Sequence, residues 1–84
     1  MDRVDLKASV LDPRLLTVFP NSSNELHKHA HETVFFILSG EGEILLGDNI
    51  KPIQKGDFVY VPRWVEHQTR NNSNRDLKIL AITD

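Results

Sequence analysis

Apolar positions along the chain occur in short runs rich in valine, isoleucine, phenylalanine and leucine. Glycine, proline, asparagine or aspartate closes each run. No window sustains the 3.6-residue period of an amphipathic helix, whereas short apolar runs between turn formers are typical of strands. The pattern predicts an all-β protein with strands at residues 15–19, 25–29, 33–39, 42–46, 50–53, 57–61, 66–70 and 77–82. So many short strands favour a closed barrel or a two-sheet jelly roll.

The segments between these strands have the composition of turns. Residues 40–42, 47–49 and 55–57 combine glycine with acidic or amide residues, which tolerate the positive φ that tight turns require. Residues 1–14 are less regular and predict either a strand or one helical turn that ends before the Asp12-Pro13 pair. As an N-terminal arm or strand, this segment could add to the sheet edge of a second copy and form part of a dimer interface.

The length and composition narrow the class of protein. Residues 1–84 suffice for a single domain of marginal stability, and the absence of cysteine removes both disulfides and thiolate metal ligands. Metal binding or self-association is therefore expected to supply additional stability. The ten basic residues are scattered and the net charge is −2, which argues against a nucleic-acid surface. No apolar stretch is long enough to span a membrane or to form a secretion signal, so the expected compartment is the cytoplasm.

Histidines provide the candidate chemistry. His27 and His29 lie two positions apart in a predicted strand, so their side chains share one face. His67 belongs to another predicted strand, 38 positions beyond His29. This spacing indicates one metal ion coordinated by strands that are distant in the sequence.

Residues 56–71 resemble the second conserved motif of the cupin superfamily, G-x5-P-x-G-x2-H-x3-N. Four of the five fixed positions carry the family residue: Gly56, Pro62, His67 and Asn71. The fifth position is Trp64, where the family has glycine. This match across the segment makes the resemblance much more specific than a single short pattern.

Residues 21–40 resemble the first cupin motif, G-x5-H-x-H-x3,4-E-x6-G. His27, His29 and Gly40 occupy their family positions. Asn21 replaces the opening glycine, a mild change because asparagine also adopts left-handed backbone conformations. Thr33 occupies the position of the ligating glutamate, so the usual carboxylate ligand is missing.

The resemblance implies a cupin-like double-stranded β-helix, also called a jelly-roll barrel, with a divalent metal held by His27, His29 and His67. Cupins carry iron, manganese, nickel, zinc or copper, and imidazole ligands suit several of these. Without a carboxylate ligand the ion keeps its full charge, which favours anionic ligands at its open positions. The Thr33 hydroxyl is expected to orient a metal-bound water or a substrate oxygen. The alternative is a cupin barrel that lost its metal together with the glutamate.

Two further residues are alternative ligands outside this set. Glu32 is next to the position of the missing carboxylate but points to the opposite face unless a β-bulge redirects it. His31 shares the parity of His29, although a strand corner is expected between positions 30 and 33. An exposed histidine in a turn is the simpler interpretation of His31.

Strand parity also predicts the pocket and the outer surface. Phe35 should face inward beside Thr33, whereas Val34, Phe36 and Leu38 face outward and are apolar, which favours a homodimer. The candidate pocket walls are Phe35, Tyr60, Trp64 and Thr69. The alternative for each aromatic side chain is ordinary core or rim packing.

Three functional classes fit these features. The first is a metal-dependent enzyme on a small molecule, such as a dioxygenase, although the sequence provides no convincing general base next to the metal. The second is a non-catalytic cupin module that binds or senses a small ligand. The third is a small subunit of a larger complex. Only the short chain and the apolar outer positions support this third class. The fold alone does not choose among them.

Overall fold

The computed structural model describes residues 2–5, 12–24 and 30–83, and all regular structure in these residues is β-strand. The strands are β1 (Asp2–Asp5), β2 (Asp12–Val18), β3 (Ser22–Ser23), β4 (Thr33–Ser39), β5 (Glu41–Leu46), β6 (Asn49–Gln54), β7 (Phe58–Val61), β8 (His67–Asn71) and β9 (Leu77–Thr83). The prediction of an all-β protein is confirmed.

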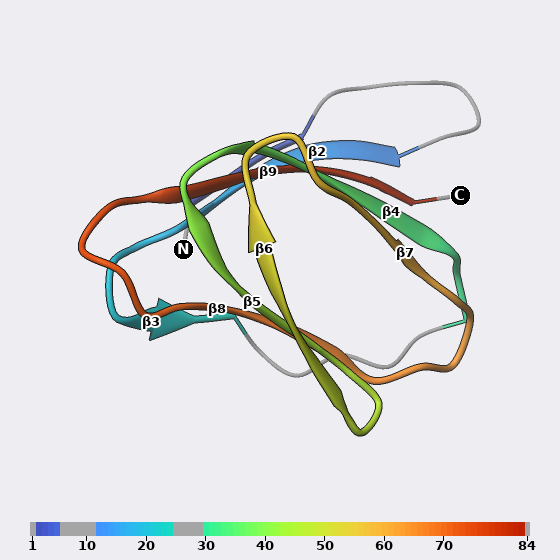
Figure 1. The fold of residues 1–84 in the computed structure, drawn as a ribbon. Helices are drawn as coiled ribbons and strands as arrows, with labels where there is room; N and C mark the ends of the chain where they lie inside the picture. Colours follow the sequence, from blue (N-terminus) through green and yellow to red (C-terminus); the bar gives the residue numbers. More distant parts are fainter. Residues whose placement is uncertain (1, 6–11, 25–29, 84) are drawn as a thin grey trace.

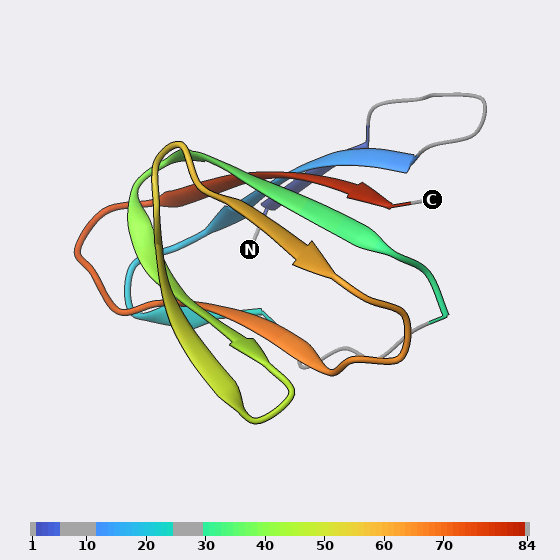
Figure 2. The same ribbon diagram turned by 45° about the vertical axis from the view of Figure 1, so that its right-hand side comes forward.

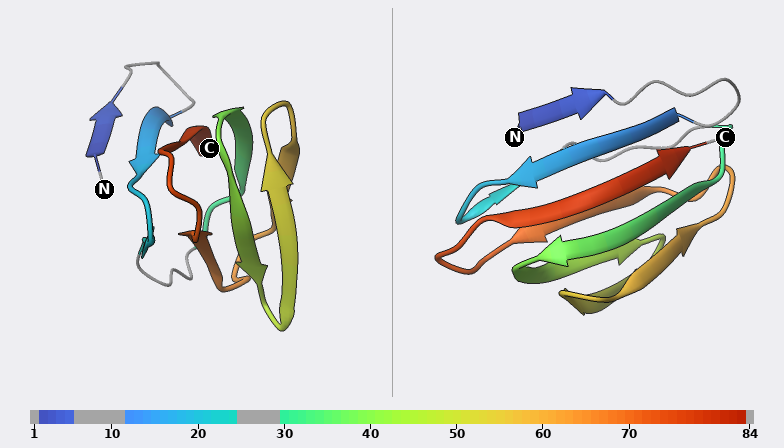
Figure 3. Two further views of the ribbon diagram at one scale, coloured as in Figure 1. Left: turned by 60° about the vertical axis from the view of Figure 1, so that its left-hand side comes forward. Right: turned by 90° about the horizontal axis from the view of Figure 1, so that it is seen from above.

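The strands form two antiparallel sheets that face each other, as Figures 1 and 2 show. The five-stranded sheet has the order β1-β2-β9-β4-β7, and the four-stranded sheet has the order β3-β8-β5-β6. The view from above in Figure 3 shows β1, β2, β9 and β4 side by side in the first layer. Because the chain crosses repeatedly between the layers, the fold is the predicted jelly-roll barrel.

The predicted strand positions agree with the structure to within a few residues. The strand predicted at residues 33–39 is β4, with the same bounds. β2 begins at Asp12, earlier than expected, because it pairs with β9 along its whole length. Residues 2–5 form the strand β1, which pairs with β2, whereas residues 6–11 of the N-terminal segment lie outside the described residues. The short β3 was not predicted, and the strand predicted at residues 25–29 lies outside the described residues.

The hydrophobic core lies between the two sheets. Alternate residues of β2, β4 and β9 face inward, as the period of two along a strand requires. The buried apolar side chains are Leu16, Val18, Phe35, Ile37, Ile44, Ile53, Val61, Leu77, Ile79 and Ala81. The residues between them face the outside of the barrel.

All four motif positions at which the cupin pattern has glycine adopt a left-handed backbone. The φ angles are 54° at Asn21, 86° at Gly40, 93° at Gly56 and 63° at Trp64. A Cβ atom at Gly40 would lie 2.3 Å from the carbonyl oxygen of Asp76, so position 40 also needs glycine for space. The backbone therefore keeps the family conformation even where asparagine and tryptophan replace glycine.

Asn71, the last residue of the second motif, has a structural role. Its side chain is buried, and Nδ2 donates a 2.9 Å hydrogen bond to the carbonyl oxygen of Val18 on β2. Its Oδ1 accepts hydrogen bonds from the backbone nitrogen and the hydroxyl of Ser73, at 3.0 and 2.7 Å. Asn71 thus links the turn after β8 to the opposite sheet and fixes the end of the strand that begins at His67.

Candidate metal centre

His67 is the first residue of β8, and its side chain lies on the inner face of the barrel. Only 3% of the residue is exposed, because His67, Thr69 and Asn71 alternate with more exposed residues along the strand. The imidazole packs against Phe35 of β4 with ring centroids 5.8 Å apart. A histidine is therefore held between the two sheets at the end of the barrel where β8 begins.

The hydrogen bond of His67 defines its tautomer. Nδ1 lies 3.2 Å from the carbonyl oxygen of Val65. Since a carbonyl oxygen only accepts, Nδ1 carries the hydrogen, and in the neutral ring Nε2 keeps the lone pair. Metal-binding histidines are usually oriented in this way, with the second ring nitrogen bound to a carbonyl or carboxylate. The chemistry of His67 thus fits a metal ligand that uses Nε2.

His27 and His29 lie outside the described residues. Within residues 2–5, 12–24 and 30–83, the structure brings together no group of three potential metal-binding side chains. The residue that precedes the 25–29 segment, Asn24, nevertheless forms hydrogen bonds with β8. Asn24 accepts the backbone N–H of Thr69 through Oδ1 at 2.7 Å, and its own N–H donates to the Thr69 carbonyl at 3.1 Å. The chain therefore enters this segment directly beside the strand of His67.

The other inward-facing candidates line the same end of the barrel. Thr33 is buried, and its hydroxyl lies 3.0 Å from the hydroxyl of Thr83 on β9. Phe35 is buried next to His67, and Thr69 is completely buried on β8. The end of the barrel that carries Thr33, Val61, His67 and Thr83 is called the mouth end below. It is on the right in Figure 1.

Tyr60 and Trp64 lie on the outside. Tyr60 is 54% exposed, and its hydroxyl donates a 2.8 Å hydrogen bond to Oε2 of Glu32. Trp64 is 61% exposed in the turn before β8. Glu32 also lies 3.4 Å from Nη2 of Arg63, whose Nη1 donates to the carbonyl oxygen of Ala30 at 3.0 Å. Glu32 is thus held on the outer side by this network, and its neighbour His31 is exposed.

Sequence reasoning missed two residues near the site. Asn24 had no recognisable signal, because its partners are on β8, more than forty positions away. Arg14 was one of the ten scattered basic residues and was given no role, yet it shares the inner face of β2 with Leu16 and Val18 and its Nε is buried. The alternation of Arg14, Leu16 and Val18 could have indicated this placement once β2 was extended to Asp12.

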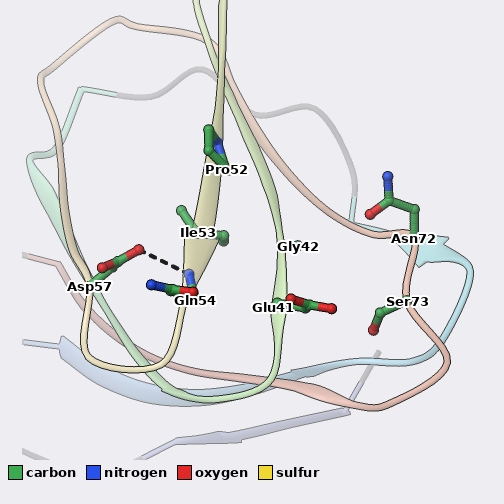
Figure 4. Close-up of a pocket in the computed structure, with 8 residues that line it drawn as sticks. All are labelled: Glu41, Gly42, Pro52, Ile53, Gln54, Asp57, Asn72 and Ser73. Atoms are coloured by element: carbon green, nitrogen blue, oxygen red, sulfur yellow. Dashed lines mark hydrogen bonds between the residues drawn. The ribbon is translucent and has the colours of Figure 1, made fainter.

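A hollow of about 460 Å³ lies at the opposite end of the barrel, which is called the turn end below. Figure 4 shows its lining side chains around the hairpin of β5 and β6 and the turn after β8: Glu41, Gly42, Pro52, Ile53, Gln54, Asp57, Asn72 and Ser73. Asp57 accepts the backbone N–H of Gln54 at 2.9 Å and so closes the turn between β6 and β7. Asn72 donates to Glu43 at 3.0 Å. These polar groups thus stabilise the local turns.

Comparisons with known proteins agree with this fold. Residues 14–83 match the family model of the cupin domain. The chain is 41% identical over 66 residues to the oxalate-binding protein of Thermotoga maritima, covering 75% of this chain and 53% of that protein. It is 31% identical over 65 residues to the 5-aminosalicylate 1,2-dioxygenase of Comamonas sp., covering 77% of this chain and 17% of that enzyme. The chain spans about half the length of the first curated relatives that it matches.

A solved structure of similar shape is that of a cupin 2 conserved barrel domain protein from Rhodopseudomonas palustris. It superposes with a TM-score of 0.90 at 29% identity, covering 98% of this chain and 59% of that one. In the described part of the chain no helix has the length and apolar character to cross a membrane. The match of the family model over most of the chain shows that this protein belongs to the cupin family.

Proposed function

We propose that this cupin binds one divalent transition metal through His27, His29 and His67, and that the metal-bound barrel holds a small molecule. The observation that carries the proposal is His67 itself, which is buried on the inner face of the barrel with Nδ1 3.2 Å from the carbonyl oxygen of Val65, an arrangement that suits a metal ligand. Imidazole ligands suit iron, zinc, nickel and copper, and manganese is included because cupins also carry it. The bound ion would act as a Lewis acid with positions open to water or a ligand.

The residues around His67 define what the protein itself contributes. Position 33 offers a threonine hydroxyl that already contacts Thr83, so the described inner wall adds no carboxylate at this position. Phe35 covers one side of the imidazole and keeps water away from it. The resulting surroundings favour a small anionic ligand, since the site would carry uncompensated positive charge.

The names of the relatives support a small ligand of this kind. One relative is an oxalate-binding protein, and another is a dioxygenase of 5-aminosalicylate, and both compounds are carboxylates. A metal-dependent enzyme such as a dioxygenase is therefore the first form of the proposal. A cupin that binds or senses its ligand without turnover is the second, and the absence of a carboxylate base on the described inner wall favours it.

Elemental analysis tests the metal site. The protein is purified without chelators and without a nickel column, and the expected result is about one transition metal ion per chain. His67→Ala should lose the metal, whereas His31→Ala, a change of the same size at an exposed position, should retain it. Metal-free wild type after equilibration with iron, zinc, manganese, nickel and copper salts would contradict the proposal. Oxygen uptake with carboxylate substrates then separates the enzyme from the binding module.

We also infer that two copies associate through the outer face of the five-stranded sheet. The pairing of β7, β4, β9 and β2 places two rows of largely apolar residues across this outer face: Phe58-Phe36-Leu80-Leu15 and Tyr60-Val34-Ile82-Pro13. Phe58 is 71% exposed, and its ring lies 4.8 Å from that of Phe36. An apolar outer face on an antiparallel sheet is typical of an interface, because a solvent-facing sheet surface is normally polar.

Light scattering during size-exclusion chromatography tests this association. Wild type should elute as a dimer, and Phe58→Glu should give a folded monomer because it places a charge in the apolar row. Ile50→Glu is the matched control, because Ile50 is similarly exposed at 55% but lies on the other sheet. A monomeric wild type, or a Phe58→Glu variant that remains dimeric, would contradict the inferred interface.

A further inference from the structure

Trp64 has a backbone conformation that suits glycine rather than tryptophan. Its φ angle is 63°, and the backbone N–H of Val65 donates to the carbonyl oxygen of Pro62 at 3.4 Å, so Trp64 is the third residue of a four-residue turn. A turn with positive φ at its third residue normally has glycine or asparagine there, because a Cβ atom is strained in the left-handed region. This chain instead has its largest kind of side chain at the strained position.

Packing within the protein does not explain this tryptophan. The residue is 61% exposed, and among the described residues its indole takes part in no hydrogen bond and no ring contact. A large apolar side chain that is both exposed and strained costs stability. Backbone outliers of this kind occur mostly at functional sites, where the strain is tolerated for the sake of the function. The indole of Trp64 is therefore a candidate for contact with a ligand.

The neighbours of Trp64 hold its turn at the mouth end. The carbonyl oxygen of Val65 lies 3.2 Å from Nδ1 of His67. On the other side, Nη1 of Arg63 donates to the carbonyl oxygen of Ala30 at 3.0 Å. The turn connects β7 of one sheet to β8 of the other, at the right-hand end of the barrel in Figure 1. Trp64 is thus fixed at the rim of the mouth end by contacts that its own side chain does not make.

A ligand bound at the proposed metal has to extend towards this rim. Phe35 packs against the imidazole of His67 with ring centroids 5.8 Å apart, and both residues are buried. Deeper in the barrel, the core side chains of Ile37 and Ile79 fill the space between the sheets. The Cα atoms of Trp64 and His67 are three residues and hence at most about 11 Å apart. An indole at the rim is therefore within reach of a group that extends outwards from the metal.

We propose that Trp64 stacks on the flat ring of an aromatic carboxylate whose carboxylate group is bound to the metal. Two aromatic rings in contact attract each other by more than the burial of their apolar area alone provides. The carboxylate fits the positive charge that three imidazole ligands leave uncompensated on the metal. The inference rests on the proposed function for the position of the metal, and it deepens that function by naming the class of ligand.

Isothermal titration calorimetry of the zinc-loaded protein with benzoate and cyclohexanecarboxylate tests the stacking. The two anions are similar in size, but only benzoate has a flat aromatic ring. Wild type should bind benzoate about fivefold more tightly than cyclohexanecarboxylate, and Trp64→Leu should remove this preference. Trp64→Phe, which keeps an aromatic ring, should retain most of it. Both variants keep a Cβ atom at position 64, so relief of backbone strain does not account for the difference.

Phe19→Leu is the matched control. It replaces another exposed aromatic side chain, which follows β2 at the turn end of the barrel, and it should leave the affinities for both anions unchanged.

A second measurement needs no variant. Trp64 is the single tryptophan of the chain, so intrinsic tryptophan fluorescence reports on this position alone. Benzoate should shift the emission of the zinc-loaded protein to shorter wavelength and roughly halve its quenching by acrylamide, because the ring covers one face of the exposed indole. Acetate, which has the carboxylate without the ring, should change neither quantity.

Three results would overturn the inference: no binding of benzoate to wild type, a preference for benzoate that persists in Trp64→Leu, or tryptophan emission that benzoate does not change. Zinc analysis separates these results from a failure of the proposed function. If wild type takes up zinc but Trp64→Leu binds benzoate equally well, the metal site stands and the stacking fails. If wild type takes up no zinc but benzoate still shifts its emission, the metal site fails and the contact with Trp64 stands.

Discussion

The two ends of the barrel differ in where their polar groups lie. At the mouth end, His67, Thr33 and Thr69 are buried on the inner faces of the sheets. At the turn end, Glu41, Gln54 and other polar side chains surround an open hollow, and several of them close turns. A polar side chain between apolar sheets is costly unless a bond or a ligand compensates it, so the three buried polar side chains of the mouth end favour that end as the location of the proposed site. At the turn end the buried Asn71 is already compensated by its hydrogen bonds to Val18 and Ser73.

The largest expected effect is a loss of zinc affinity, which should follow a substitution at the mouth end but not one at the turn end. Replacing His67 removes one of three proposed ligands, so His67→Ala should weaken zinc binding by at least a hundredfold. Glu41→Gln at the turn end should change it by less than about twofold, because Glu41 is exposed and far along the sheet. Competition with a chromophoric chelator measures the zinc affinity of both variants. Equal losses in the two variants would remove the distinction between the ends.

A second contrast concerns stability at the turn end itself. Asn71 is buried with bonds to Val18 and Ser73, so Asn71→Ala should lower the free energy of unfolding by about 2–3 kcal/mol. Asn72→Ala, one residue further, removes only an exposed bond to Glu43 and should cost less than about 0.5 kcal/mol. Urea denaturation of both variants gives the values. A similar loss of unfolding free energy in the two variants would mean that the buried hydrogen bonds of Asn71 contribute little to stability.

A third test restores the missing carboxylate at the mouth end. Thr33→Glu places a potential ligand at the family position, so it should raise zinc affinity by about tenfold while it destabilises the metal-free protein. Thr33→Val, which removes only the contact with the Thr83 hydroxyl, should leave the affinity unchanged. Calorimetric titration and thermal unfolding with and without zinc separate the two effects. Unchanged affinity in Thr33→Glu would place position 33 away from the metal.

The smallest predicted effect concerns the left-handed backbone before β8. Trp64 has a φ of 63° and is mostly exposed, so Trp64→Gly should relieve strain and stabilise the protein by up to about 1 kcal/mol. Gly56→Ala is the reverse change at a φ of 93° where a Cβ meets no atom, and it should destabilise by about 1 kcal/mol. Thermal unfolding measures both. A destabilised Trp64→Gly variant would indicate that the indole makes contacts that outweigh its strain.

Much of the fold could be predicted because its signals are local. The alternation in residues 33–39 gives β4 directly, and glycine at positions 40 and 56 marks turns that require positive φ. The left-handed backbone of Trp64 was not predicted, although the glycine that the family pattern has at this position was a signal for it. Local pattern and family motif thus sufficed wherever a residue's role depends on its own backbone.

Other features depend on contacts between distant segments. Asn24 bonds to Thr69, and Arg14 joins the row of Phe35 only because β2 pairs with β9 and β9 with β4. The sequence suggested Tyr60 as a pocket wall, whereas the structure directs it outward to Glu32. Such placements follow from strand order and register, which a single sequence does not specify. His27 and His29 remain sequence-based predictions outside the described residues.

X-ray absorption spectroscopy of the zinc-loaded protein tests the central claim most directly, because it counts the atoms around the metal. Three imidazole nitrogens are expected at about 2.0–2.1 Å from the zinc ion, with the remaining positions filled by light atoms. The His67→Ala variant should lose one imidazole from this shell or bind no zinc. A wild-type shell of oxygen atoms without imidazole would contradict the three-histidine centre, and so would protein that takes up no zinc.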